Sequence, residues 1–198
     1  MPRSSNSASV KVDKYNQNQV KVSPITWIAI GGFFVVILTL LLIFSPNNPE
    51  RIYNAYTAYG VTDLPKDHPL YQVSYEGGLF KKGLEDIIEK EEVVVVYIGY
   101  AACPGCQAHV APMSKYFDST GMDEYVDKVY YLDTTKDLKG YESLAAKYSQ
   151  IVETTPQIAL IIDGELVKIY VPTENLTATD INRNMRTFFE DSIDLINE

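Results

Sequence analysis

The fold of this chain is decided by the stretch Val93-Val-Val-Val-Tyr-Ile-Gly-Tyr-Ala-Ala-Cys-Pro-Gly-Cys106. It opens with four valines, whose β-branched side chains suit a pleated strand, and no charged residue interrupts the run. The run therefore predicts a strand that is buried on both faces. Apolar residues at helical spacing follow Cys106, so we expect Cys103 on the turn between this strand and a helix.

A cysteine in that place has distinctive chemistry. The free N–H groups and the positive end of the helix dipole stabilise a thiolate there. Pro104 suits the first helical turn, and Gly105 keeps the backbone open near the sulfur atoms. Cys103 and Cys106 are the only cysteines of the chain. They predict a redox-active disulfide as the working group, with no separate cofactor and no structural disulfide framework.

A zinc site is the alternative use of such a pair. It would need two more ligands, and the chain offers only His68 and His109 with no second cysteine pair. This set departs from the usual ligand spacings, so we expect no bound metal. Covalent haem attachment is excluded because Gln107 stands where the histidine would have to follow the second cysteine.

The rest of the pattern alternates between strands and helices. A hairpin is predicted over 153–170, where two apolar runs flank an Asp163-Gly164 turn. Further elements are expected as a strand at 71–75, a helix over 79–90, a strand at 129–133, a helix over 141–148, and an amphipathic helix over 181–196 capped by Thr179 or Asp180.

The resulting order of strand, Cys-x-x-Cys, helix, strand, helix, Thr-Pro, hairpin and helix resembles the thioredoxin superfamily over about residues 71–198. The resemblance implies an α/β thioredoxin-like fold with a central mixed sheet flanked by helices. It also implies that Pro156 is cis beside the cysteine pair and that Thr155 and Pro156 line the substrate groove. By the family's mechanism, Cys103 is the attacking thiol and Cys106 resolves the mixed disulfide.

Two residues mark departures from that family. Tyr97 stands where cytosolic thioredoxins carry a buried acid, and Ala102 stands where they carry a tryptophan. His109 lies one helical turn after Cys106 and is a candidate for tuning thiol acidity, as is Tyr97. The alternative for His109, which we favour, is a partly exposed histidine without a catalytic role.

Within the superfamily, the chain is more similar to the bacteriocin transport accessory proteins of Gram-positive bacteria. The likeness rests on Val96 to Cys106 and on the later Thr-Thr-Pro at 154–156. It implies a thiol–disulfide oxidoreductase that acts on exported peptides or proteins and exchanges electrons with a membrane or extracytoplasmic partner. A redox-inactive binding module for an exported peptide is the alternative.

The N-terminal third predicts a membrane anchor. Residues 1–24 read as a disordered tail with a net charge of +3, and residues 25–44 carry no charge. Twenty residues of helix span about 30 Å, which matches a bilayer core. A cleaved signal peptide is disfavoured because the apolar run is too long and lacks a small-x-small site. The positive tail predicts a single-pass protein with a cytoplasmic N-terminus and an extracytoplasmic catalytic domain, joined by a linker and short helix at 45–70.

The net charge of the chain limits the classes of partner that it can bind. The whole chain carries −9, so the part after the tail carries −12. An acidic domain is unsuited to nucleic acid, which requires a positive surface. It would attract a cationic peptide, but the alternative that we favour is that the charge serves only solubility.

Overall fold

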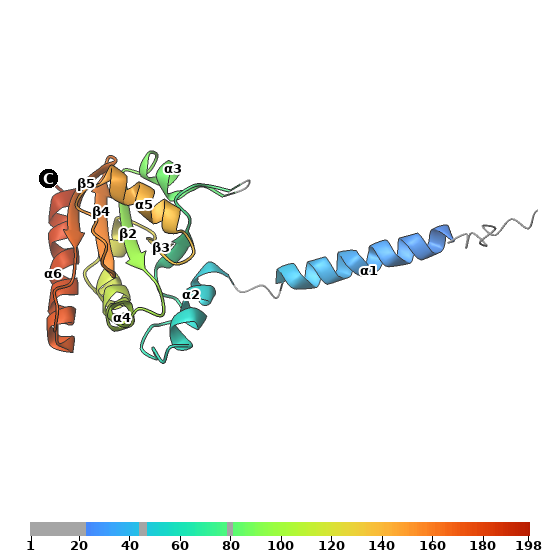
Figure 1. The fold of residues 1–198 in the computed structure, drawn as a ribbon, viewed down its shortest axis with the longest axis horizontal. Coiled ribbons are helices and arrows are strands. Elements are labelled where there is room, and N and C mark those ends of the chain that lie inside the picture. Colours follow the sequence, from blue (N-terminus) through green and yellow to red (C-terminus); the bar gives the residue numbers. More distant parts are fainter. Residues whose placement is uncertain (1–22, 44–46, 79–80) are drawn as a thin grey trace, which may run out of the picture. The chain divides into compact units, whose positions relative to one another are not determined.

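The structure is a computed structural model that describes residues 23–43, 47–78 and 81–198. The chain divides into two units, residues 1–45 and 46–198, whose elements are labelled in Figure 1. The predicted tail lies outside the described residues except for its last two positions. Residues 44–46, at the junction between the units, also lie outside the described residues.

The first unit contains helix α1, Pro24–Ile43. No charged residue occurs in it, and nearly all of its described side chains are exposed. Within the described ranges, however, no helix is both long enough and apolar enough to cross a membrane. The spanning helix expected over 25–44 is therefore not found there. Residue 44 and the side chains of 41–43 lie outside the described residues.

The second unit is built from five strands and six helical elements among the residues described. In chain order they are α2 Asn48–Thr57, β1 Leu70–Val73, α3 Leu84–Ile88, β2 Val93–Gly99, α4 Pro104–Ser119, the short 3₁₀ helix η1 Met122–Glu124, β3 Val129–Asp133, α5 Leu138–Lys147, β4 Gln157–Ile162, β5 Glu165–Tyr170 and α6 Ala178–Ile196.

The strands form one mixed sheet in the order β1-β3-β2-β4-β5. The first three of these run parallel, whereas β4 pairs antiparallel with β2 and β5 pairs antiparallel with β4. The predicted Asp163-Gly164 turn is confirmed: both residues have positive φ, +48° and +79°, as a two-residue hairpin turn requires. A mixed sheet with flanking helices matches the thioredoxin-like fold that the sequence implied (Figure 1).

The central strand β2 explains why the sheet has helices on both faces. Its residues from Val94 to Ile98 are all fully buried, which confirms the strand predicted from the valine run. Val95 and Tyr97 belong to the apolar core shared with α2, α4 and α6. Val94 and Val96 belong to the core shared with α3 and α5. Side chains alternate along a strand, so one uninterrupted apolar run supplies both layers.

Two helices begin earlier than the sequence predicted because of side-chain caps. Helix α5 begins at Leu138, where Asp137 accepts a hydrogen bond from the Gly140 N–H at 3.0 Å. For α6, the expected caps Thr179 and Asp180 were both wrong. Thr177 is the cap, and Asp180 completes a capping box by accepting the Thr177 N–H at 3.1 Å.

Helix α3 is much shorter than predicted. It covers Leu84–Ile88 rather than 79–90, and its interior side chains Leu84, Ile87 and Ile88 are buried. Gly83 precedes the helix with an extended backbone and packs against the backbone of Tyr75, so the chain cannot be helical there. Residues 79 and 80 lie outside the described part.

The segment before β1 is part of the domain core. Ile52 and Tyr56 of α2 are buried in the same cluster as Val61 and Leu64 from the loop that follows. Of the tyrosines at positions 53, 56 and 59, Tyr56 is fully buried whereas Tyr59 is 55% exposed. Positions i, i+3 and i+6 drift around a helix, so they do not share a narrow face.

Asn48 joins α2 to the free edge of the sheet. Its side-chain amide donates to the Gln72 carbonyl at 2.8 Å, and its side-chain oxygen accepts the Gln72 N–H at 2.6 Å. The amide thus takes the place of a neighbouring strand at the middle of β1. This protects an edge that would otherwise be open to pairing with another chain.

Replacing Asn48 by Ala is expected to lower the free energy of unfolding by about 1–2 kcal/mol, because two backbone groups of Gln72 lose their partner. Urea unfolding of the purified protein measures this loss. Asn54→Ala is the control, since Asn54 is an exposed residue of the same helix. Equal stability of the two variants would contradict the bridging role of Asn48.

Candidate functional site

Cys103 is the residue at which β2 gives way to α4. It is the N-cap of α4, with Pro104 in the first turn, and its sulfur accepts a hydrogen bond from the Cys106 N–H at 3.3 Å. Its own N–H donates to the carbonyl of Tyr100 at 3.1 Å. The cysteine therefore lies at the positive end of a sixteen-residue helix, where the sequence placed it.

The two sulfur atoms differ in their surroundings. Both cysteines are free thiols in this structure. Cys106 is fully buried, whereas Cys103 retains 6% of its surface, so the first cysteine is the more accessible of the two. Burial, followed by the hydrogen bond with Cys103, raises the pKa of Cys106 to about 12. Cys106 is therefore a protonated thiol at neutral pH.

Pairing between β2 and β4 brings the second predicted piece of the site to the first. Ile98, next to last in β2, lies opposite Gln157, the first residue of β4. The Thr155–Pro156 bond just before it is cis, as the resemblance implied. The Thr155 hydroxyl donates to the Cys103 sulfur at 3.4 Å, and the Cys103 thiol lies 3.6 Å from the Thr155 carbonyl oxygen.

The close approach of the Cys-Pro-Gly-Cys turn to the cis-proline requires a glycine at position 105. A β-carbon at Gly105 would lie 3.1 Å from Cδ of Pro156 and 3.3 Å from the Thr155 carbonyl oxygen, tighter than ordinary packing. The backbone of the Cys-Pro-Gly-Cys turn therefore lies directly against the cis-proline. The structure thus brings together Cys103, Cys106, Gly105, Thr155 and Pro156.

Gln157 is a residue of the site that sequence reasoning missed. It is completely buried, and its side-chain amide donates to the carbonyls of Val152 and Thr154 at 2.6 and 2.5 Å. Its side-chain oxygen accepts the Val152 N–H at 3.0 Å. Gln157 thus fixes the loop that presents Thr155 and Pro156. The signal in the sequence was a lone polar residue at the head of a buried apolar strand.

Tyr97 lies under the cysteine pair, as its position in the sequence suggested. It is fully buried, and its hydroxyl donates to the Cys106 carbonyl at 3.3 Å. Burial raises its pKa well above the ordinary value, so it stays a neutral donor. The backbone between them is tight: a β-carbon at Gly99 would lie 2.7 Å from the Cys106 sulfur and 3.1 Å from Cε1 of Tyr97.

His109 was expected to be partly exposed, and this was wrong. It is buried, because α4 packs it against β5. Its Nδ1 lies 2.7 Å from the Gly105 carbonyl and its Nε2 lies 3.0 Å from the Tyr170 hydroxyl. A carbonyl only accepts, so Nδ1 carries the proton and Tyr170 donates to Nε2. Both ring nitrogens are thus engaged away from the sulfur atoms.

The two histidines are also unavailable as zinc ligands, because their ring nitrogens are used in hydrogen bonds. In His68, Nδ1 accepts the Leu70 N–H at 3.2 Å while Nε2 donates to the Pro49 carbonyl at 3.1 Å. The two histidines thus each use both nitrogens in hydrogen bonds that hold the fold. Across the described ranges, no group of three or more acidic, histidine or cysteine side chains is arranged to hold a metal ion.

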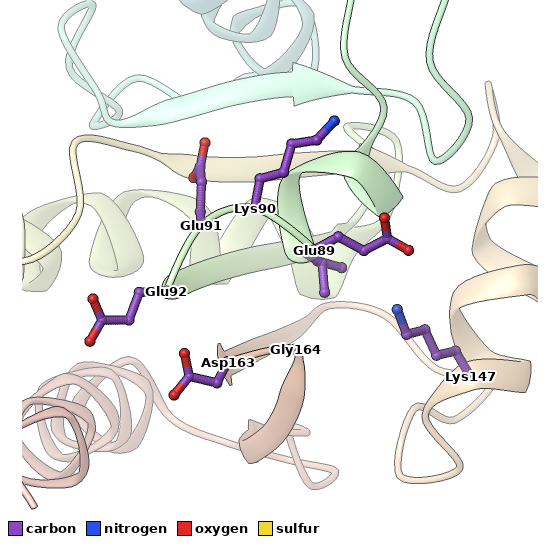
Figure 2. A pocket seen from close by; sticks show the side chains of 8 residues that line it. Glu89, Lys90, Glu91, Glu92, Lys147, Asp163 and Gly164 are labelled. Atoms are coloured by element: carbon purple, nitrogen blue, oxygen red, sulfur yellow. The ribbon is translucent and has the colours of Figure 1, made fainter.

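A separate hollow lies at the other end of β2. It has a volume of about 450 Å³ and is bounded by Glu89, Lys90, Glu91 and Glu92 before β2, by Lys147 of α5 and by the Asp163-Gly164 turn. Figure 2 shows charged side chains around it and no thiol. Because it opens at the amino end of β2 rather than beside Cys103, the hollow takes no part in thiol chemistry.

Comparisons with known proteins find thioredoxins among the solved structures. No protein-family model and no curated protein matches the chain. A thioredoxin from Trypanosoma brucei brucei is 15% identical with a TM-score of 0.45, covering 66% of this chain and 95% of its own. A mutant thioredoxin from Halobacterium salinarum NRC-1 is 20% identical, with a TM-score of 0.37 and coverage of 62% and 95%. Malassezia sympodialis thioredoxin is 16% identical, with a TM-score of 0.40 and coverage of 60% and 90%.

These likenesses are weak, so the fold assignment depends on the strand order, the strand directions and the position of the cis-proline. On those grounds the chain has a thioredoxin-like α/β fold, with a cysteine pair at the head of α4.

The histidines predict how stability depends on pH. Burial lowers the pKa of both His68 and His109 below the ordinary value of 6.5. Below pH 6.5 the unfolded chain therefore binds more protons than the folded protein. The free energy of unfolding should be fully present above about pH 7 and fall as the pH drops, by about 1.4 kcal/mol for each unit of pKa depression.

NMR titration of the imidazole protons checks this directly, because the chain has only two histidines. Both should titrate below 6.5, with His68→Gln and His109→Gln assigning the signals. Values at or above 6.5, or a free energy of unfolding that does not change between pH 7 and pH 5, would refute the burial argument.

Proposed function

We propose that this protein is a thiol–disulfide oxidoreductase that acts on exported peptides or proteins through the Cys103–Cys106 pair. The observation that supports it best is the asymmetry of the two thiols. Cys103 keeps a small exposed fraction, 6%, and accepts hydrogen bonds from the Cys106 N–H and the Thr155 hydroxyl. Cys106 is fully buried, and burial raises its pKa so that it stays protonated. Such a pair separates the attacking role from the resolving role.

The chemistry follows from those surroundings. The two donors and the helix N-terminus stabilise negative charge on the Cys103 sulfur. As a thiolate, it attacks one sulfur of a substrate disulfide, forms a mixed disulfide and expels the other sulfur as a thiolate. Cys106 then attacks the Cys103 sulfur, closes the internal disulfide and releases the second substrate thiol. Thr155 and Pro156, beside Cys103, would hold the substrate backbone.

Replacing Cys103 by Ser should reduce disulfide exchange on insulin to the background rate, because the attacking sulfur is lost. Cys106→Ser should instead accumulate mixed disulfides at Cys103, which mass spectrometry detects. Ser119→Ala, at the far and exposed end of α4, is the control and should keep full activity. Unchanged exchange by the Cys103 variant would favour the redox-inactive binding module instead.

The reduction potential of the pair decides the direction of electron flow. It is measured by equilibrating the protein with a glutathione series. A reduction potential of about −120 mV would make the internal disulfide an oxidant for exported peptides. A potential of about −270 mV or lower would make the dithiol a reductase that draws electrons from a membrane partner.

The location of the domain is proposed from the sequence alone. The uncharged stretch 25–44 beside a tail of net charge +3 would anchor the chain in the cell membrane with residues 45–198 outside the cytoplasm. The acidic charge of that part suits a cationic peptide. The likeness to bacteriocin transport accessory proteins implies that the substrate is an exported peptide.

Fractionation of cells that express the full chain tests this location. The protein should pellet with membranes, resist extraction by alkaline carbonate and be cleaved by protease added to intact spheroplasts. Phe34→Lys combined with Val36→Lys should release it, because charge in the middle of a spanning helix costs about 2.5–3.5 kcal/mol per residue. Recovery of the unaltered chain in the soluble fraction would refute the anchor.

A further inference from the structure

A groove with basic side chains runs along β1, and neither cysteine lines it. It has a volume of about 880 Å³ and lies among α2, β1, β3 and the segments on either side of α3. Its charged lining consists of Glu91, Asp133 and Asp137 and of Arg51, Lys81, Lys82, Lys128 and Lys136. Five cations against three carboxylates give this basic groove a net charge of +2, whereas the chain after residue 24 carries −12.

The three carboxylates of the basic groove already have partners inside the protein. Both oxygens of Glu91 lie 2.8 Å from the Tyr130 hydroxyl, which donates to them. Asp137 accepts two backbone N–H groups, at 2.7 and 3.0 Å. Asp133 accepts the Thr135 hydroxyl at 2.7 Å. The negative charges of the groove are thus used to hold the fold together.

Most of the cations are not used in this way. Within the described ranges, no carboxylate forms an ion pair with Lys81, Lys82 or Lys128. Lys81 and Lys82 are exposed, and Lys128 is half-buried. Acidic groups of a partner would therefore gain these three charges without first breaking an ion pair of the protein.

Aromatic rings and an ion pair fix the cations at two points along β3. The Lys128 Nζ lies 5.4 Å from the ring centroid of Tyr71 and 5.8 Å from that of Tyr130, and a ring face attracts an ammonium without neutralising it. Lys136 pairs with Asp133 at 3.0 Å. Asp133 follows Tyr130 by three residues, about 10 Å along a strand. A single small anion would therefore reach only one of the two points.

The backbone edge of β1 is closed to an added strand. Asn48 bonds to the carbonyl and the N–H of Gln72, at 2.8 and 2.6 Å. The Leu70 N–H donates to a histidine nitrogen at 3.2 Å, and the Ser74 carbonyl accepts the Leu84 N–H at 2.9 Å. A partner could pair with the middle of β1 only by displacing Asn48. Recognition in the groove must therefore come from side chains, above all from the lysines.

We propose that the basic groove binds an extended acidic segment of a partner protein, whose carboxylates pair with Lys82, Lys128 and Lys136. This interaction is separate from thiol–disulfide exchange and does not depend on it. An extended chain can enter a groove and reach both points along β3, whereas an anionic bilayer is flat and cannot enter it. The acidic remainder of the domain repels any acidic peptide whose carboxylates lie outside the groove, which adds specificity.

The test uses the full chain in neutral detergent and a fluorescein-labelled peptide of alternating glutamate and serine. Fluorescence anisotropy at low salt should show saturable binding that weakens as salt is added, because salt screens accessible charges. The same peptide with glutamine in place of glutamate should not bind. Lys82→Gln combined with Lys128→Gln should raise the Kd about tenfold, since each accessible charge pair contributes about two- to fivefold.

Lys115→Gln combined with Lys139→Gln is the matched control. Both lysines are exposed and lie outside the groove, and the Lys115 Nζ lies 5.1 Å from the ring centroid of Tyr116, as Lys128 lies over its own rings. The control should keep the original Kd, as should Lys128→Arg, which keeps a cation over the rings. Equal weakening by the two double variants, or no saturable binding by the unsubstituted chain, overturns the proposal.

Competition experiments detect a different occupant. Displacement of the peptide by inorganic phosphate at an equal concentration of charge would indicate a small-anion site. Displacement by phosphatidylglycerol added to the micelles would indicate a membrane site. Either result overturns the proposal, whereas an acidic peptide that competes better than both supports it.

Disulfide exchange on insulin is a separate readout. Both double variants should keep the original rate of exchange and the original urea midpoint, because the substituted lysines contact neither cysteine nor the buried core. A lower urea midpoint for the Lys82 and Lys128 variant would attribute its weaker binding to misfolding and overturn the proposal. Absence of exchange by the unsubstituted chain would instead refute the proposed function and leave peptide binding as measured.

Discussion

The structure depends on the antiparallel register between β2 and β4. Ile98 opposite Gln157 is the pairing that places the cis Thr155–Pro156 bond beside the turn that begins α4. Shifting this register by one residue would displace Gln157 and the cis Thr155–Pro156 bond from the turn that begins α4. The Asp163-Gly164 turn holds β5 to β4, and Gln157 holds the loop before β4. The site is therefore fixed by backbone pairing rather than by side chains alone.

Much of this could be predicted from the sequence because the determining signals are local. The valine run had to be a doubly buried strand, and the Cys-Pro-Gly-Cys turn had to open a helix, since Pro104 and the apolar spacing after it allow little else. The parts that were missed depend on contacts between distant segments. Nothing local distinguishes the buried Tyr56 from the exposed Tyr59, because the difference arises when α2 packs on the sheet. Likewise, His109 is buried by Tyr170, sixty-one residues away.

The predicted start of α6 was wrong for a related reason. Several residues in a row could have capped α6, and propensity alone did not select among Thr177, Thr179 and Asp180. The choice was made by the geometry of a capping box, in which two side chains satisfy each other's backbone N–H. For the first unit, the uncharged stretch predicts a membrane span, whereas no described helix is long enough and apolar enough to form one.

Tyr97 and Tyr131 share the buried core that contains Cys106. A buried carboxylate beside Cys106 would accept its proton but would need several hydrogen bonds or a cation to remain charged in an apolar core. Tyrosine avoids that cost because it is neutral, and burial raises its pKa further. A neutral phenol, however, can only stabilise the thiolate and cannot remove the proton.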